Sequence, residues 1–332
     1  MDDSECDVVV RGAGVAGLSA ALHLVESARG GAAPRVIVVD DDRAEGGPIA
    51  GPTALLPTPQ PDPAALAERF APAVRARLER LGRASLDAIE RFASRFDDAC
   101  GFRRVPWIHR ALGSGRAADE SPATVAIVDL DAFHARLRTA AASRGVRVVA
   151  AADADAATRG AIRTVFALDA PLVRQDAWVR EVAIAGRAQR IVGTAESPRA
   201  ARIVTLGSGF GVLATDERGR VVAAEGCEPS NRGDPFDRGP EPTGQSRLER
   251  FARECVPEIQ IVQRESFAAA FTCDGLPLVG PHPARDGALL CGSWNGAGAT
   301  FEFACGSVLA EWIVAGRPAD ESWTLFSPRR ML

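Results

Sequence analysis

The stretch CDVVVRGAGVAGLSAALHLVESARGGAAPRVIVVD, residues 6–40, decides the fold of this chain. A short apolar run at 6–12 predicts a buried strand, residues 15–28 have the composition of a helix, and residues 35–40 predict a second buried strand. Two strands joined by a helix form a βαβ unit, in which the strands run parallel. The sequence therefore predicts a parallel α/β sheet that begins at the N-terminus.

The turn between the first strand and the helix reads Gly12-Ala13-Gly14-Val15-Ala16-Gly17. In this pattern the first glycine permits a tight turn, the second lets the backbone approach a pyrophosphate, and the third lets the helix pack closely on the strand. Asp40 ends the next strand, where a carboxylate can accept hydrogen bonds from ribose hydroxyls. The pattern predicts a dinucleotide site; the alternative is a tight β–α turn that serves packing alone.

A second glycine-rich segment lies near the C-terminus. Residues 292–298, GSWNGAG, lead from a predicted strand at 288–292 into a predicted helix from about 299 to 315. The amides of that helix N-terminus could face the electron-rich edge of a flavin ring, because the positive end of a helix stabilises negative charge. A glycine-rich helix start with only a packing role is the alternative here.

The middle of the chain predicts helices and many short strands. Residues 43–63 are rich in Gly and Pro and are expected to lack regular structure. The other expected elements are helices at 64–96, 129–144 and 246–255, strands at 146–150 and 162–168, and a series of short strands over 178–225.

Composition excludes several classes of protein. The chain has 332 residues, enough for about two domains, and 43 acidic against 39 basic residues gives a net charge of −4. No basic stripe is present, so neither nucleic acid nor an anionic membrane is expected as a partner. The sequence contains neither Lys nor Tyr. Lysine Schiff-base enzymes, standard P-loop NTPases, protein kinases and Tyr–Lys dehydrogenases are therefore excluded.

Cysteine and histidine give no sign of a metal site. The seven cysteines include no CxxC pair and the four histidines are scattered, so neither structural zinc nor a disulfide framework is expected. The start MDDSECDVVV has no basic segment, and no apolar run approaches membrane-spanning length. We expect a cytoplasmic protein that acts on a small molecule, and a protein partner or a homo-oligomer stays open.

Both ends of the chain together resemble the FAD-dependent D-amino-acid oxidase / glycine oxidase / sarcosine oxidase superfamily. The segments that carry the resemblance are 8–24, 35–40, 128–148, 271–281, 287–318 and the closing FSPRR at 326–330, so it spans nearly the whole chain. The resemblance implies an α/β fold in which a Rossmann-like FAD-binding domain is interleaved with a substrate domain built on an antiparallel sheet. The FAD-binding domain would comprise residues 1–60, 125–175 and 270–332, and the substrate domain residues 61–124 and 176–269.

The resemblance also implies a set of site residues and a noncovalent FAD. The family's flavin-tethering cysteine falls at about Phe267, and Cys273 is expected to be a small buried residue. His134 is expected to be structural and His282 to be exposed in a turn. The expected cofactor-binding residues are Gly12, Gly14, Ala16, Gly17, Asp40, Asp41, Thr53, Ala54, Ala167, Gly292, Asn295, Gly296, Ala297, Gly298 and Thr300. The catalytic residues are unknown, with His109, Trp294 and Thr300 as candidates, and no metal is expected.

The chain departs from the family at the substrate site. The arginine that holds a substrate carboxylate stands three residues before the threonine of the T-x-D-G-x-P motif, and here that position is Ala269. Its Tyr partner and the Lys that assists oxygen are absent, and Asp169 replaces the glycine of the family's Ala-Thr-Gly strand end. Arg110 or Arg174 could substitute for the missing arginine.

Three functions follow as hypotheses. The leading one is FAD-dependent dehydrogenation of a C–N bond in a small amine or amino-acid-like substrate. The second is oxidation of a C–OH or C–C bond in a specialised biosynthetic pathway. The third is a flavoprotein subunit without catalysis.

Overall fold

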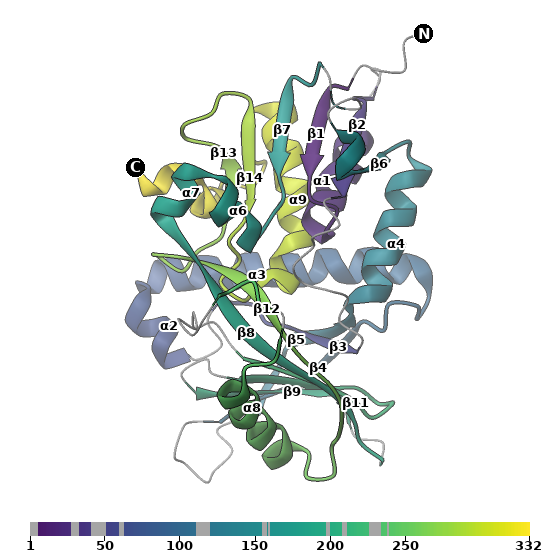
Figure 1. The fold of residues 1–332 in the computed structure, drawn as a ribbon, viewed down its shortest axis with the longest axis vertical. Helices are drawn as coiled ribbons and strands as arrows, with labels where there is room; N and C mark the ends of the chain where they lie inside the picture. Colours follow the sequence, from purple (N-terminus) through teal and green to yellow (C-terminus); the bar gives the residue numbers. More distant parts are fainter. Residues whose placement is uncertain are drawn as a thin grey trace.

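The computed structural model describes residues 6–27, 33–40, 51–59, 63–110, 120–154, 158, 160–196, 200–207, 211–225, 234–237 and 239–332. Figure 1 shows two layers of sheet, one above the other, with helices packed between and around them. The fold is the mixed α/β type expected from the sequence, with a parallel sheet and a second, curled sheet.

The upper sheet in Figure 1 has six strands in the order β13-β14-β7-β1-β2-β6. Its strands are β1 (Val8–Arg11), β2 (Val36–Asp40), β6 (Arg147–Ala150), β7 (Arg163–Phe166), β13 (Leu278–Pro281) and β14 (Ala288–Gly292). All neighbours run parallel except β13 and β14. The N-terminal βαβ prediction is therefore confirmed: β1 pairs with β2 in parallel through the crossover helix α1 (Val15–Glu26).

The lower sheet has eight strands in the order β12-β8-β11-β10-β9-β4-β5-β3. They are β3 (Pro52–Leu55), β4 (Arg103–Arg110), β5 (Glu120–Asp129), β8 (Ala183–Thr194), β9 (Arg202–Leu206), β10 (Gly211–Thr215), β11 (Arg220–Glu225) and β12 (Gln260–Thr272). Neighbours run antiparallel apart from β4 and β9. The long pair β8–β12 reaches from this sheet up to the six-stranded sheet, so it connects the two layers (Figure 1).

Helices cover the sheets and fill the space between them. Besides α1 they are α2 (Pro63–Arg69), α3 (Pro72–Ala93), α4 (Leu130–Ser143), α6 (Ala170–Gln175), α7 (Ala177–Val182), α8 (Pro242–Cys255) and α9 (Gly298–Ala315). In the centre, α9 packs on α1, and Ser19 of α1 donates a hydrogen bond to the carbonyl of Phe303 at 2.6 Å. Gly306 makes this close approach possible, because a Cβ there would lie 2.5 Å from the Cβ of Ser19.

By length and apolar composition α9 could cross a membrane, and among the described helices it alone meets that test. It packs against α1, α3 and β14, and residues such as Phe301, Cys305 and Leu309 have no exposed surface. The position of α9 in the structure is that of a core helix.

Two expectations for secondary structure are wrong. Residues 52–55, predicted to be irregular, form β3, because they pair with β5 at the edge of the lower sheet. Residues 178–182, predicted to be part of a strand, form most of α7, because the side chain of Asp176 accepts the amide of Val179 and caps a helix there. Strand β3 and half of β5 fall in the ranges predicted for the FAD-binding domain, yet they pair in the lower sheet; the domain boundaries stay a prediction.

The α1–α9 contact generates a stability test. We expect Gly306→Val to lower the free energy of unfolding by about 1–3 kcal/mol, because the added side chain overpacks against Ser19 and the backbone of Ala16. Ser307→Ala, a change at a half-buried position on the same helix, should stay within about 0.5 kcal/mol of wild type. Urea unfolding of the three proteins checks this. Equal stability of Gly306→Val and wild type would contradict the close approach.

Candidate functional site

The first glycine turn lies at the carboxyl end of β1 and leads into α1. A Cβ on Gly12, whose φ is +107°, would overlap the carbonyl oxygen of Ala167, and one on Gly17 would overlap the carbonyl oxygen of Gly12. Packing therefore requires glycine at both positions. Gly14 differs, because its φ is −68° and a Cβ there would meet no protein atom within 4 Å. The protein itself does not require glycine at 14, whereas a ligand that approaches the backbone does.

The amides that follow Gly14 are available to an anion. No described side chain caps the N-terminus of α1, and its first turn contains no acidic residue. From α4, His134 holds the turn in place, with its Nε2 2.7 Å from the carbonyl oxygen of Ala13. Free N–H groups and the positive end of a helix form a ready binding site for a phosphate. His134 is structural, as the sequence predicted.

Asp40 lies at the carboxyl end of β2, beside this turn. Its carboxylate is partly exposed, and Arg138 of α4 donates to its Oδ2 at 2.8 Å. This ion pair fixes the carboxylate at the sheet edge where the ribose of a dinucleotide would lie. Asp41, also predicted to contact the cofactor, falls outside the described residues.

The second glycine-rich turn lies at the carboxyl end of β14. Ser293 and Asn295 adopt left-handed φ values of +54° and +55°. The amide of Asn295 donates to the carbonyl of Ala270 in β12, and its side-chain oxygen accepts the amide of Thr272 at 2.9 Å. These bonds attach the turn to the strand that comes from the lower sheet. The helix α9 then starts at Gly298 without a described side-chain cap.

Asp169 lies just after the carboxyl end of β7 and bonds to both the 292–298 turn and β12. Its Oδ1 accepts the amide of Trp294 at 3.0 Å, and its Oδ2 accepts the amide of Ala270 at 3.1 Å. Burial raises the pKa of Asp169 to about 6, and the backbone hydrogen bonds oppose that rise. The carboxylate replaces the family's glycine and fastens β7, the 292–298 turn and β12 to one another.

A second carboxyl group, Glu302 on α9, lies behind the turn. A Cβ on Gly298 would be 2.5 Å from its Oε1, so the side chain folds back toward the start of the helix. Burial, and then the charge of Asp169, raise the pKa of Glu302 to about 7. The thiols of Cys291 and Cys305 face the same region, and burial holds the pKa of each well above its usual value. Glu302 therefore keeps its proton more readily than an exposed glutamate does.

Two buried hydroxyls support a cofactor in this region. Thr53 Oγ1 on β3 and Ser293 Oγ in the second turn have no hydrogen-bond partner among the described residues. Leaving a buried hydroxyl unpaired costs free energy, so such groups call for a ligand or water. Together with the open space at Gly14 and the two uncapped helices, they fit a group that carries phosphates at one end and a polar ring at the other, as FAD does.

The structure brings most of the predicted cofactor residues to one edge of the six-stranded sheet. The predicted residues and their positions are Gly12, Gly14, Ala16 and Gly17 in the first turn and α1, Asp40 at the end of β2, Ala167 after β7, Gly292, Asn295, Gly296 and Ala297 in β14 and the second turn, and Gly298 and Thr300 in α9. Thr53 and Ala54 come from β3, at the edge of the lower sheet. Their contacts with a cofactor stay a prediction.

The catalytic candidates are divided between the two sheets. Trp294 and Thr300 are buried at the second turn, with 5% and 2% of their surfaces exposed. His109 lies on β4 in the lower sheet, where its Nδ1 is 3.0 Å from Thr205 Oγ1. The same hydroxyl oxygen accepts a hydrogen bond from Nε1 of Trp107. Within the described ranges no group of three or more His, Cys, Asp or Glu side chains is arranged to hold a metal ion.

Two expectations about single residues are wrong. His282 is buried, because its Nδ1 accepts the amide of Ala284 and its Nε2 lies 3.2 Å from the carboxylate of Asp176. Cys273 is exposed, because it follows the end of β12, where the chain turns away from the core. Ala269 is buried on β12 opposite Gly186 of β8, so the missing arginine leaves a small apolar position between these strands.

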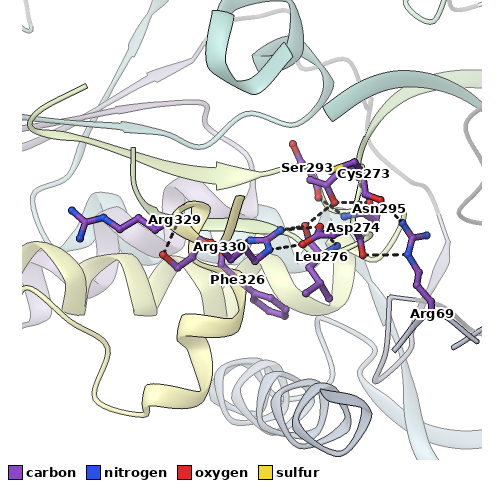
Figure 2. Close-up of polar contacts among 11 residues, drawn as sticks. Arg69, Cys273, Asp274, Leu276, Ser293, Asn295, Phe326, Arg329 and Arg330 are labelled. Atoms are coloured by element: carbon purple, nitrogen blue, oxygen red, sulfur yellow. Dashed lines mark hydrogen bonds and ion pairs between the residues drawn. The ribbon is translucent and has the colours of Figure 1, made fainter. Parts of the chain in front are cut away.

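The C-terminal FSPRR segment fixes the loop that follows β12. Arg330 donates from Nε and Nη2 to both carboxylate oxygens of Asp274, at 2.7 and 3.1 Å, and from Nη2 to the carbonyl of Leu276 (Figure 2). A two-pronged arginine–carboxylate pair of this kind is strong and directional. The FSPRR end of the chain therefore has a structural task at the edge of the site.

The structural roles of Asp169, Glu302 and Arg330 were missed from the sequence. The substitution of Asp169 for glycine was visible as a departure, but its bonds to Trp294 and Ala270 join residues more than a hundred positions away. Glu302 resembles any glutamate of a first helical turn, and only its folded surroundings distinguish it.

The raised pKa of Glu302 gives a pH test. The pKa of Glu302 is about 7 in the folded protein, above its ordinary value of 4.5. Such a group stabilises the folded state fully below about pH 4.5, and this stabilisation is lost as the pH rises through 7. The contribution of Glu302 to the wild-type free energy of unfolding should therefore fall between about pH 5 and about pH 8. Glu302→Gln should flatten this fall, whereas Glu321→Gln, at a site 80% exposed, should keep it. Urea unfolding at several pH values measures it, and parallel wild-type and Glu302→Gln curves would refute the assignment.

Comparisons with known proteins agree with this geometry. A family model described as FAD dependent oxidoreductase matches residues 7–125 and 116–312. A search of curated proteins finds no match. Glycine oxidase from Geobacillus kaustophilus has the same fold, with 20% identity, coverage of 98% of each chain and a TM-score of 0.72.

Two further solved structures are similar over the whole chain. Iminodiacetate oxidase from Chelativorans sp. BNC1 is 17% identical, with 97% of this chain and 98% of that chain covered and a TM-score of 0.74. L-proline dehydrogenase from P. horikoshii is 13% identical, with 99% and 98% covered and a TM-score of 0.70. At these identities the structures show the fold, and the family model, which covers most of the sequence, shows the family. The chain belongs to the FAD dependent oxidoreductase (DAO) family.

Proposed function

We propose that this oxidoreductase binds FAD noncovalently and dehydrogenates a C–N bond in a small amine or amino-acid-like substrate. One observation carries the proposal: the uncapped N-termini of α1 and α9 follow β1 and β14, which lie on either side of β7 and run parallel to it. The carboxyl ends of these strands meet at one sheet edge, where open α/β sheets bind their ligands.

The residues at this edge have separate tasks. The amides after Gly14 would bind the pyrophosphate, and Asp40, held by Arg138, would accept the ribose hydroxyls. The N-terminus of α9 would stabilise negative charge at the polar edge of the flavin ring. Bound FAD supplies the hydride acceptor, so no protein nucleophile is required.

Strands β8 and β12 would exclude water from the reacting face. Their paired ends carry small side chains, with Ala269 opposite Gly186 and Ala270 opposite Ala185. Removing water from such a site strengthens the electrostatic interactions inside it.

The names of the similar structures support C–N chemistry, since they describe oxidases or dehydrogenases of glycine, iminodiacetate and proline. The alternative of C–OH or C–C oxidation is favoured by one observation, the absence of an arginine at position 269. Two arginines were suggested as substitutes for the missing one. The guanidinium carbon of Arg174 lies 4.3 Å from the centre of the Phe236 ring. Burial raises the pKa of Cys255 at the end of α8, and the positive charge of Arg110 opposes that rise.

Anaerobic reduction of the bound flavin tests the proposal. The purified protein should carry a yellow chromophore that acid precipitation releases completely, because the attachment is noncovalent. A panel of small amines should bleach this colour, and the matching alcohols should not. Bleaching by alcohols alone would favour C–OH oxidation, and no bleaching by any compound would favour a non-catalytic subunit.

Asp40→Ala should weaken FAD binding. The substitution removes charge-assisted hydrogen bonds worth on the order of 1.5–3 kcal/mol, which corresponds to roughly 10–150-fold in the dissociation constant. Asp286→Ala, at an exposed position in the loop between β13 and β14, is the matched control and should leave affinity unchanged. Fluorescence titration of the apoprotein with FAD measures both. An unchanged constant for Asp40→Ala would show that Asp40 does not face the ribose.

Glycine, sarcosine and D-alanine should reduce the flavin poorly. Their carboxylate would enter a desolvated space beside Ala269 without a partner, at a cost of several kcal/mol. Stopped-flow reduction at millimolar substrate, compared with amines that lack the carboxylate, measures the effect. Rapid reduction by glycine would mean that another cation replaces the missing arginine. Ala269→Arg should raise turnover of amino acids if the rest of the pocket keeps the family's geometry.

A further inference from the structure

A pocket of about 330 Å³ opens where α2, the α7–β8 junction and the loop after β12 come together. Its inner wall includes Thr272 and Asn295, which belong to the β12 end and to the second glycine-rich turn. Two arginines, Arg69 and Arg180, line it from different helices. The function proposed above requires neither of them.

Arg69 is held in a fixed orientation. Its Nε donates to the carbonyl of Asp274 at 3.2 Å and its Nη2 to the carbonyl of Cys273 at 3.1 Å (Figure 2). Gly275 has a φ of +74°, and a Cβ there would lie 2.6 Å from Arg69 Cζ. The guanidinium therefore lies against bare backbone, and no bond between described residues uses its Nη1.

Arg180, from α7, is held in a similar way. Its Nη2 donates to the carbonyl of Arg174 at 3.0 Å, and its Nε points to the carbonyl of Val173 at 3.4 Å. Within the described chain neither Arg69 nor Arg180 forms an ion pair with a carboxylate. Glu181 is the one acidic residue among the described residues that line the pocket, so this described lining has a net positive charge.

The remaining wall is apolar. Phe70, Val182, Ile184 and Phe271 contribute to it. Ile184 is 50% exposed, which is unusual for a large hydrophobic side chain in this structure, and it pairs with Phe271 across β8 and β12. Exposed apolar surface beside immobilised, uncompensated cations suits a ligand with an anionic head and an apolar body.

We propose that this pocket binds a small organic carboxylate. The carboxylate would lie between Nη1 of Arg69 and Nη1 of Arg180, and the apolar part of the ligand would cover Ile184 and Phe271. Backbone carbonyls already hold both guanidiniums in place, so little side-chain entropy is lost when the anion binds. Arginine suits this task because its planar group matches the two oxygens of a carboxylate.

Cys273 lines the same pocket and is exposed, so it can report on the charge there. The experiment compares alkylation of Cys273 by iodoacetate, an anion, and iodoacetamide, its neutral analogue, with peptide mass spectrometry to isolate this site. Both reagents react with the same thiolate. The ratio of the two alkylation rates therefore does not depend on the fraction of Cys273 that is ionised. At about 6 Å in water each guanidinium contributes roughly a threefold preference for the anion.

We expect the iodoacetate-to-iodoacetamide ratio at Cys273 in the FAD-loaded protein to exceed that of the urea-unfolded protein by about three- to tenfold. Arg69→Gln and Arg180→Gln should each lower it about threefold. Arg317→Gln, at a site 76% exposed on another face, should leave it unchanged. A ratio equal to that of the unfolded protein, or one that neither pocket variant alters, would overturn the proposal.

Protection by a ligand completes the test. Benzoate at millimolar concentration should slow iodoacetamide labelling of Cys273 in wild type, and both arginine variants should weaken this protection. Benzyl alcohol, which has the same ring without the charge, should not protect. Equal protection by benzyl alcohol would show that the pocket binds apolar groups without a role for the arginines. Stronger protection by phenyl phosphate than by benzoate would show that the ligand is a phosphate ester and not a carboxylate.

Discussion

The half-buried carboxylate of Asp169 makes the interaction on which the rest of the site depends. It sits at the carboxyl end of β7 and accepts the amides of Trp294 and Ala270. One amide belongs to the turn after β14 and the other to a strand of the lower sheet, so this side chain joins the two layers where they meet, together with Asn295. Because Trp294 and Ala270 are buried, losing either bond would leave a polar group unpaired in the interior, which is costly.

The glycines around this point divide into two kinds, and the division leads to function. Gly12 and Gly17 have no room for a side chain, so they allow β1, β7 and α1 to approach closely. Gly14 has open space before it and an ordinary backbone conformation. Packing explains the first two, whereas the space beside the third is open to a ligand that approaches the backbone. The same edge carries the uncapped start of α9 and an unpaired hydroxyl on Ser293, and the family model for FAD dependent oxidoreductases matches the chain.

Local patterns predicted the parts of the fold that local physics determines. The βαβ unit and α4, whose cap Asp129 accepts the amide of Ala132, follow from periodicity and capping alone. Strand β3 was missed because its partner β5 lies some seventy residues away, and α7 because one capping aspartate outweighs the β-branched residues of its segment. At the site, glycine spacing predicted both turns. The bonds of Asp169 and the position of Arg69 depend on long-range contacts that no local pattern contains.

Amide hydrogen exchange tests the central role of Asp169 most directly. In wild type the amides of Trp294 and Ala270 should exchange slowly, since both residues are buried and both amides donate to this carboxylate. In Asp169→Ala they should exchange at least about tenfold faster, as expected for the loss of a bond to a charged acceptor. The amide of Val10, in the centre of the upper sheet, should keep its wild-type rate and show that the fold is intact. Unchanged exchange at Trp294 and Ala270 would contradict the account.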